Sequence, residues 1–238
     1  MEVTIYETPK TMKLFLDTAD TEAIKEGYAT GLIDGVTTNP SLIFKNGGDP
    51  EYVYQTLIEL GIPDISMEVV GTGEQMVAEG RRLVEKFGKD QTTIKVPCTR
   101  GGLAACRLLS RDLIKVNVTL IFSPVQAILA AKAGAKYVSP FVGRVDDNSF
   151  DGIDLIDQIS DVYTIQGIRK TEILAASVKT CLYIFSNTAG GMVQMLAPYS
   201  NALPTSLTFL IEAPNISVSF QFCFAYTLAI SLIRHKPP

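Results

Sequence analysis

Short apolar runs alternate with stretches of helical periodicity along most of this 238-residue chain. Runs of this length and β-branched content favour strands, whereas the segments between them place apolar residues on one helix face. Such alternation predicts a parallel sheet with right-handed crossovers. We predict strands at 13–17, 35–40, 65–69, 92–97, 113–120, 136–142 and 172–177, and helices at 18–31, 51–60, 73–87, 101–110, 124–133 and 150–160.

A polar residue stands at or near the C-terminal end of nearly every predicted strand. On a closed (β/α)8 barrel these ends converge on one mouth, where active sites are built. Chains of about this length commonly form such α/β barrels as one domain. We therefore predict a TIM barrel. The polar residues expected to share its mouth are Asp17, Thr37, Asn39, Glu68, Lys95, Asn117, Thr119, Ser139, Arg144 and Ser177.

Lys95 is the most informative of these residues, because it interrupts the β-branched run at 92–97. A strand of a parallel sheet is covered on both faces, so a lysine within it sits where burial penalises its charge. A lysine whose pKa is lowered in this way can attack a carbonyl and form a Schiff base. The alternative is a lysine exposed on an edge strand, or one whose amine reaches solvent.

Three of the polar residues also have plain structural interpretations. Asp17 can cap the helix that follows it, and Asn39 can be a turn residue before its helix. Arg144 can be a solvated charge. Taken singly these residues predict little, but their repeated placement at strand ends favours one shared pocket.

The composition excludes several classes of function. A net charge of −4 and a pI near 5.1 provide no basic field for nucleic acid. His235 is the single histidine, which disfavours His-dependent nucleophilic catalysis and His-rich metal sites. Cys98, Cys106, Cys181 and Cys223 form no C-x-x-C pair, so neither a zinc site nor a disulfide framework is predicted. A reducing, cytoplasmic setting fits this usage.

Six motifs resemble the transaldolase family, and more closely its small members grouped with fructose-6-phosphate aldolase. The resemblance covers residues 12 to about 180, with the motifs in family order. The motifs are Leu-Asp-Thr-Ala at 16–19, Gly-Val-Thr-Thr-Asn-Pro-Ser-Leu-Ile at 35–43, Ile-Lys-Val-Pro at 94–97, Asn-Val-Thr-Leu-Ile-Phe-Ser at 117–123, Ser-Pro-Phe-Val-Gly-Arg at 139–144 and Leu-Ala-Ala-Ser at 174–177.

The resemblance implies a class I aldolase-type barrel that transfers a dihydroxyacetone unit between sugar phosphates, without metal or organic cofactor. Lys95 would attack the C2 carbonyl of fructose 6-phosphate or sedoheptulose 7-phosphate. Asp17 would take the proton of the C4 hydroxyl as the C3–C4 bond breaks. Glu68, through a water and with Thr119, would shuttle protons during Schiff-base formation.

The resemblance also implies which residues hold the substrate. The dihydroxyacetone hydroxyls would be held by Thr37, Asn39, Asn117 and Ser139. The phosphate would be bound by Arg144, Ser177 and Lys179. A guanidinium fork suits a phosphate, and a lysine can serve as a point charge beside it.

Two positions bear on the subtype within the family. By resemblance, transaldolases carry a glutamate and a phenylalanine where aldolases that release free dihydroxyacetone carry a glutamine and a tyrosine. This chain has Glu68 and Phe141, so a transferase is favoured over a fructose-6-phosphate aldolase.

The composition changes abruptly near residue 180. In residues 180–238 only Glu212, Arg234 and Lys236 are charged. We therefore divide the chain into an N-terminal extension at 1–11, a transaldolase-like barrel at 12–180 and an apolar segment at 181–238. The extension is polar and lacks the apolar core of a signal peptide.

Three interpretations of the last segment are open. Residues 217–224 alternate with period 2 and can form a strand, whereas 216–233 contains no charge and is just long enough to suggest a poor membrane span. The third interpretation is that a splice change or frame shift has replaced the family's ending. A barrel whose final strand and helix are incomplete would have unpaired sheet edges. The protein would then be a catalytically impaired variant, and the homo-oligomer expected from the family would also be affected.

Overall fold

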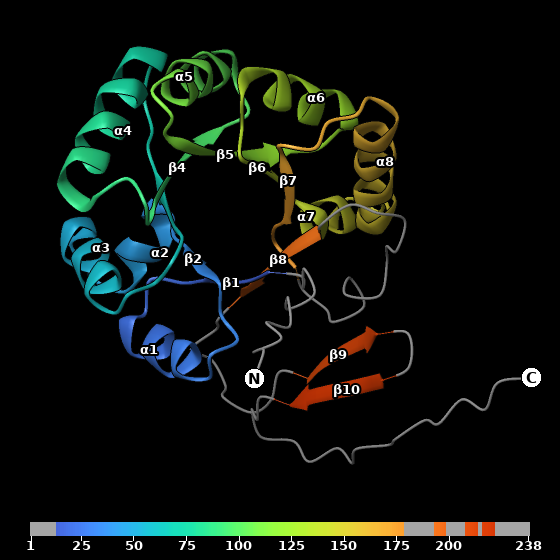
Figure 1. Cartoon of the computed structure of the whole chain (residues 1–238), viewed down its shortest axis with the longest axis horizontal. Helices are drawn as coiled ribbons and strands as arrows, with labels where there is room; N and C mark the ends of the chain where they lie inside the picture. The colour runs from blue at the N-terminus through green and yellow to red at the C-terminus, as the bar shows by residue number, and fades with distance from the viewer. Residues whose placement is uncertain (1–12, 179–192, 199–207, 214–215, 222–238) are drawn as a thin grey trace, which may run out of the picture.

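The structure is a computed structural model that describes residues 13–178, 193–198, 208–213 and 216–221. Parallel strands close into a barrel in the order β1 to β8, so the predicted (β/α)8 architecture is confirmed (Figure 1). The strands are β1 Leu14–Asp17, β2 Gly35–Thr37, β3 Ile65–Glu68, β4 Thr92–Pro97, β5 Lys115–Ile121, β6 Tyr137–Pro140, β7 Glu172–Ala175 and β8 Val193–Pro198.

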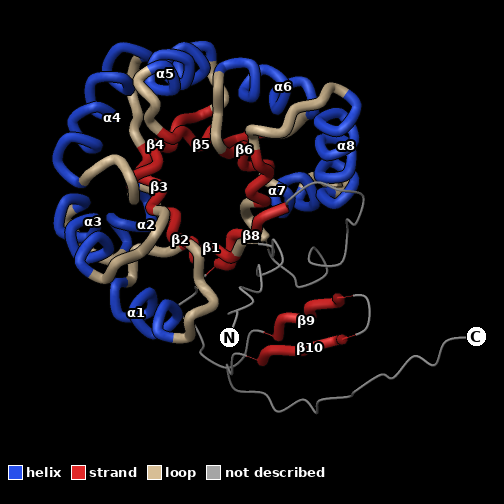
Figure 2. The backbone as a smooth tube through the Cα atoms, in the orientation of Figure 1, coloured by secondary structure: helices blue, strands red, loops and turns tan. Residues whose placement is uncertain are grey.

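Helices surround the barrel, and the strands line its centre (Figure 2). Two of them, α2 and α7, are six-residue helices that the apolar periodicity does not predict, because so short a helix barely completes one repeat of the pattern. The helices are α1 Thr21–Ala29, α2 Pro40–Lys45, α3 Pro50–Glu59, α4 Gly73–Phe87, α5 Arg100–Arg111, α6 Pro124–Ala133, α7 Val142–Asp147 and α8 Gly152–Ile165.

Local capping signals explain where the helices begin and end. Thr72 and Gln75 form a reciprocal capping box at the start of α4. The Ser123 side chain caps α6, which ends at Gly134 in the left-handed conformation with φ 95°. The caps at Thr72 and Ser123 fix where the loops after β3 and β5 end, and these two strands carry Glu68, Asn117 and Thr119.

The eighth strand is not predicted by the sequence pattern. Its backbone pairs with both ends of the sheet, since Met195 aligns with Leu14 of β1 and with Ala175 of β7. The barrel is therefore closed in its strands. Residues 179–192, where a helix between β7 and β8 would be expected, lie outside the described residues.

A two-stranded antiparallel sheet follows the barrel in sequence. It consists of β9, Thr208–Ala213, and β10, Ile216–Gln221. The strand expected in 217–224 is thus present through Gln221. The first residues of the stretch considered as a membrane span belong to this strand, and residues 222–233 lie outside the described part. No helix in the described residues is long and apolar enough to cross a membrane.

Apolar side chains fill the barrel interior as well as the layer beneath the helices. Phe15 of β1 and Tyr137 of β6 pack edge to face with ring centroids 5.8 Å apart. Because β1 and β6 are not neighbours in the ring, this contact must cross the interior. The barrel interior near the N-terminal ends of the strands is therefore a packed core and not a channel.

A buried polar cluster closes the barrel at the N-terminal ends of its strands. Asp64 accepts hydrogen bonds from Thr93 at 2.6 Å and from Tyr137 at 2.9 Å, and it lies 3.3 Å from the Lys115 amine. Burial raises the pKa of the Tyr137 hydroxyl, and the charge of Asp64 adds to this effect. Tyr137 therefore stays a neutral hydrogen-bond donor to Asp64.

A second ion-pair group lies beside this cluster. Glu172, at the start of β7, is 3.0 Å from the amine of Lys13 and also pairs with Lys136. Lys13 immediately precedes β1, so its ion pair with Glu172 links β1 to β7, the two strands with which β8 pairs. The two groups together occupy the end of the barrel opposite the candidate site.

Candidate active site

Lys95 is buried at the C-terminal half of β4, as predicted from its strand. It is 4% exposed, and its amine lies 3.1 Å from Glu68 Oε2 and 3.2 Å from the carbonyl oxygen of Thr38. Thr38 follows β2, which is not a neighbour of β4, so the amine reaches across β3 inside the barrel. This geometry excludes the exposed-lysine alternative.

Glu68 and Thr119 flank Lys95 on the two neighbouring strands. Glu68 aligns with Lys95 in the register of β3 and β4, and its side chain is 17% exposed. Thr119 aligns with Pro97 in the register of β4 and β5. Its hydroxyl is buried and has no hydrogen-bond partner among the described residues. A buried hydroxyl without a partner can accept or donate to a water or substrate group.

Asp17 ends β1 and faces Thr37 of β2. The Thr37 hydroxyl donates to Asp17 Oδ1 at 2.7 Å, and the two residues align in the strand register. The helix cap interpretation does not apply to Asp17, because Asp20 caps α1. Asp17 is thus held as an acceptor through Oδ1, and no described residue donates a hydrogen bond to its Oδ2.

Asn117 is oriented by two hydroxyl groups. Ser139 donates to its Oδ1 at 2.9 Å, and its Nδ2 donates to the Ser66 hydroxyl at 3.4 Å. Ser66 is a member of the site that the strand-end pattern does not reveal. It lies two residues before Glu68, and this spacing places both side chains on the same side of β3.

The structural interpretation of Asn39 as a turn residue before its helix applies in part. Its Oδ1 caps α2 by accepting a hydrogen bond from the Leu42 backbone N–H at 2.9 Å. The side chain is half-buried. The cap occupies the carbonyl oxygen of the amide, which leaves its Nδ2 for any substrate contact.

The residues expected to hold the phosphate lie farther along the mouth. Arg144 is on α7 and is exposed, and half-buried Ser177 follows β7 with φ 60°. Phe141 precedes α7 and packs edge-on against Phe122, with ring centroids 5.9 Å apart. Lys179 lies outside the described residues.

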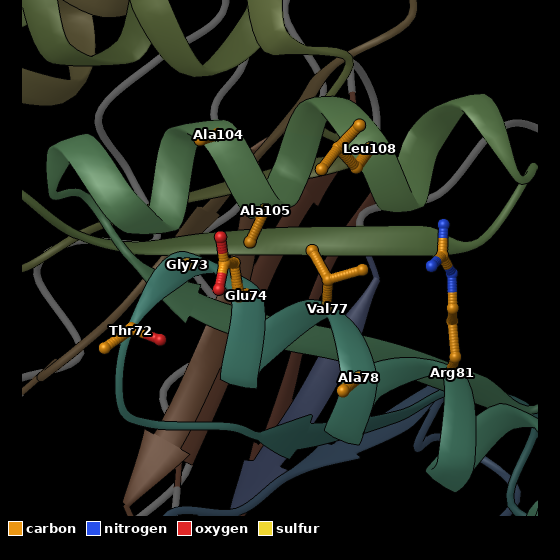
Figure 3. A pocket seen from close by; sticks show the side chains of 9 residues that line it. All are labelled: Thr72, Gly73, Glu74, Val77, Ala78, Arg81, Ala104, Ala105 and Leu108. Carbon is orange, nitrogen blue, oxygen red and sulfur yellow. The ribbon is translucent and has the colours of Figure 1, made fainter.

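A groove on the outer surface is separate from this mouth. It encloses about 690 Å³ between α4 and α5 (Figure 3) and is lined by Val77, Leu108 and small residues, with Glu74 and Arg81 also on its wall. None of the candidate site residues lines it. The titratable groups capable of aldol chemistry gather at the strand ends instead.

The chain matches a known family over most of its length. Residues 14–194 match the family described as Transaldolase/Fructose-6-phosphate aldolase, and this span begins at β1 and reaches into β8. The chain belongs to this family. The match extends past residue 180, the boundary drawn from composition.

Curated relatives of the chain are named probable transaldolases. The chain is similar to a probable transaldolase of Nitrosopumilus maritimus (strain SCM1), with 51% identity over 174 residues, 73% of this chain and 78% of the relative. It is also similar to a probable transaldolase of Ruegeria sp. (strain TM1040), with 50% identity over 188 residues, 79% of this chain and 85% of the relative. A third relative is a probable transaldolase of Caulobacter vibrioides (strain NA1000 / CB15N), with 48% identity over 174 residues, 73% of this chain and 79% of the relative. Members of the transaldolase/fructose-6-phosphate aldolase family are aldolase- or transferase-type enzymes, which agrees with a buried lysine at the mouth.

Proposed function

We propose that this protein is a transaldolase of the class I, Schiff-base type. It transfers a dihydroxyacetone unit from sedoheptulose 7-phosphate or fructose 6-phosphate to an aldose phosphate in the pentose phosphate pathway of the cytoplasm. The observation that carries the proposal is the buried Lys95 amine with the Glu68 carboxylate 3.1 Å away. An amine in this position has a proton acceptor at hand.

The first half of the reaction forms the Schiff base. The Lys95 amine adds to the C2 carbonyl of the ketose phosphate, and the resulting carbinolamine loses water to give an iminium ion. Glu68, acting through a water, accepts the amine proton and returns a proton to the departing hydroxyl. The buried hydroxyl of Thr119, which has no hydrogen-bond partner among the described residues, supports the assignment of a water in this part of the site.

The second half breaks and remakes a carbon–carbon bond. Asp17 takes the proton of the C4 hydroxyl, the C3–C4 bond breaks, and its electron pair moves onto the iminium to form an enamine while the aldose phosphate leaves. The enamine then attacks the carbonyl of the acceptor aldose, whose oxygen takes the proton back from Asp17, and addition of water to the new iminium releases the product and Lys95. The hydrogen bond from Thr37 supports this role, because it fixes the direction of the Asp17 carboxylate.

The remaining residues bind substrate. The dihydroxyacetone hydroxyls are assigned to Thr37, Asn39, Asn117 and Ser139. The phosphate is assigned to Arg144, Ser177 and Lys179. The exposure of Arg144 supports its assignment, since its guanidinium is accessible to a phosphate at the mouth.

A fructose-6-phosphate aldolase is the second candidate, because the matched family includes both activities. Glu68 and Phe141 favour transfer over release of free dihydroxyacetone. The third candidate is not an active enzyme. It is a catalytically impaired variant, which would result if the barrel lacked its last strand and helix. Pairing of β8 with β1 and β7 favours the active enzyme over this variant.

The decisive experiment traps the Schiff base. Purified protein incubated with fructose 6-phosphate and borohydride should carry a three-carbon adduct on Lys95, identified by peptide mass spectrometry. Lys95→Ala should carry none. A folded protein whose Lys95 stays unlabelled under these conditions overturns the proposal and favours the impaired variant. Light scattering on the same sample reports whether the homo-oligomer expected from the family forms.

A further inference from the structure

Leu120, near the C-terminal end of β5, has a left-handed backbone conformation. Its φ is 60°, a region that residues other than glycine rarely adopt, because the Cβ atom crowds the backbone there. The pairing of β5 with β6 is irregular at the same point. Val118 aligns with Val138, whereas Ile121 aligns with Pro140. Two residues of β5 therefore stand opposite one residue of β6, which is the arrangement of a β-bulge.

Pro140 of β6 gives a reason for the interruption of this ladder. Proline has no backbone N–H, so β6 cannot donate a hydrogen bond at this position. The next N–H along the chain, that of Phe141, donates to the carbonyl of Ile121 at 3.0 Å. Backbone pairing between the two segments thus resumes beyond Leu120, and the left-handed residue spans the gap.

The bulge lies among residues of the candidate site. Thr119 immediately precedes Leu120, and its carbonyl accepts the Cys98 N–H at 2.8 Å. Asn117 is oriented by side-chain hydrogen bonds, including the one from Ser139, but the buried Thr119 hydroxyl has no hydrogen-bond partner among the described residues. A β-branched side chain has few rotamers. The direction of the Thr119 hydroxyl is therefore set by the backbone that carries it.

We propose that the left-handed conformation of Leu120 positions the Thr119 hydroxyl at the mouth, so that Leu120 acts through its backbone as a positioning residue for Thr119. This inference rests on the proposed function, in which Thr119 assists proton transfer with Glu68 during Schiff-base formation. Strained backbone conformations of this kind are found at functional sites, where the surrounding structure maintains them.

Two substitutions separate a role of the backbone from a role of the leucine side chain. Leu120→Asn keeps the conformation, because asparagine adopts positive φ more readily than other non-glycine residues. Leu120→Val opposes it, because a β-branched residue at positive φ is a severe outlier, yet valine retains an apolar side chain. A backbone role predicts that asparagine replaces leucine better than valine does. A packing or substrate-contact role of the side chain predicts the opposite order.

Leu113 provides a matched control for both substitutions. It also has φ 60°, and it lies just before β5, at the end of the strand opposite the mouth. Leu113→Val introduces the same backbone conflict as Leu120→Val, and Leu113→Asn relieves it in the same way. Urea unfolding gives the stability of all four variants. Leu113→Val should be less stable than Leu113→Asn, with borohydride trapping at the wild-type rate in both.

The first measurement is amide hydrogen exchange by NMR, which needs no turnover. The N–H groups of Cys98 and Phe141 bond to the carbonyls on either side of Leu120. Both should exchange about tenfold faster in Leu120→Val than in Leu120→Asn, because loss of the bulge loosens these bonds. The Thr38 N–H, which bonds to the Ser66 carbonyl at 3.1 Å, is the internal reference and should not differ. Equal exchange at Cys98 and Phe141 in the two variants would overturn the conformational role.

The second measurement is the rate of borohydride trapping with fructose 6-phosphate. Leu120→Val should lower this rate about tenfold or more, whereas Leu120→Asn should stay within about twofold of the wild type. The opposite order would assign the role to the leucine side chain and overturn the proposal. Wild-type protein that traps no adduct would refute the transaldolase proposal alone, because hydrogen exchange still decides whether the conformation of Leu120 holds the backbone of Thr119.

A double-mutant cycle tests whether Leu120 acts through Thr119. Thr119→Ala removes the hydroxyl that the bulge is proposed to position. Adding Leu120→Val to Thr119→Ala should slow trapping by no more than about a further twofold, since substitutions that act through one group are not additive. A further tenfold loss in the double variant would show that Leu120 acts on another group, and would overturn its assignment to Thr119.

Discussion

Glu68 Oε2 lies 3.1 Å from the Lys95 amine, and the two residues stand opposite each other in the register of β3 and β4. Neighbouring parallel strands thus supply the amine and its carboxylate at the same height in the barrel. The Lys95 side chain is almost fully buried, so this carboxylate and the Thr38 carbonyl satisfy its amine in place of water.

Glu68→Gln should slow adduct formation. The substitution keeps the shape of the side chain and removes the proton acceptor that lies 3.1 Å from the Lys95 amine. We expect the rate of borohydride trapping to fall by about 10²-fold or more. Glu172→Gln is the control, since it removes another lysine-paired carboxylate at the far end of the barrel. Equal trapping rates in wild type and Glu68→Gln would contradict the assignment of Glu68.

Asp17→Asn should separate Schiff-base formation from bond cleavage. The amide can still accept the hydrogen bond from Thr37, but it cannot take the proton of the C4 hydroxyl. Transfer should fall by about 10²- to 10⁴-fold, the usual contribution of a general base. Trapping with fructose 6-phosphate should then give a six-carbon adduct on Lys95 in place of the three-carbon one. A three-carbon adduct formed at the wild-type rate speaks against this role for Asp17.

Phe141→Tyr should shift the balance between transfer and release. The residue lies at the mouth between β6 and α7, where an added hydroxyl can orient a water toward the enamine. We expect more free dihydroxyacetone per transfer event, measured by coupled assay of both products. Phe122→Tyr, at the partner ring of the aromatic pair, is the control. An unchanged ratio in Phe141→Tyr would count against the use of this position to favour transfer.

Glu172→Gln should alter stability at acid pH and leave the chemistry intact. Burial acts to raise the pKa of Glu172, but the hydrogen bonds from Lys136 and Lys13 outweigh it, and the net pKa is lowered. A carboxyl group with a lowered pKa stabilises the fold above its unfolded-state pKa, and this contribution is lost as pH falls through the folded-state pKa. The wild type should therefore lose unfolding free energy on acidification more steeply than the variant.

Urea unfolding at neutral pH and at a series of acid pH values measures this difference. Glu59→Gln is the control, because Glu59 is an exposed carboxylate on α3. It should leave the pH dependence of stability as in the wild type. Parallel curves for wild type and Glu172→Gln would show that the ion pairs with Lys13 and Lys136 contribute nothing to the folded state.

Much of the barrel could be predicted from the sequence, because amphipathic helices, alanine-rich helices and β-branched strands can be recognised from their own side chains. The helices at 73–87 and 124–133 are confirmed at the predicted bounds. The strand β8 could not be predicted in this way. Its sequence, Val-Gln-Met-Leu-Ala-Pro, lacks both alternation and a polar end, and it is defined by pairing with β1 and β7.

The candidate site was predictable to the extent that it consists of side chains at strand ends. Lys95, Glu68, Asp17, Thr37, Asn117 and Ser139 are all brought to the mouth with the contacts described above. Thr38 could not be recognised, because its contact with Lys95 is made by a backbone carbonyl that every residue has.

The pairing of Leu14 with Met195 sets a condition on how the chain reaches its native state. The first strand in the described part of the chain obtains its second neighbour from β8, about 180 residues later, so ring closure is among the most non-local contacts described. Until β8 pairs with β1, one edge of β1 exposes backbone N–H and C=O groups that can pair with a strand of another chain. The yield of native protein should therefore increase with dilution, and with chaperones that cover this unpaired strand edge during synthesis.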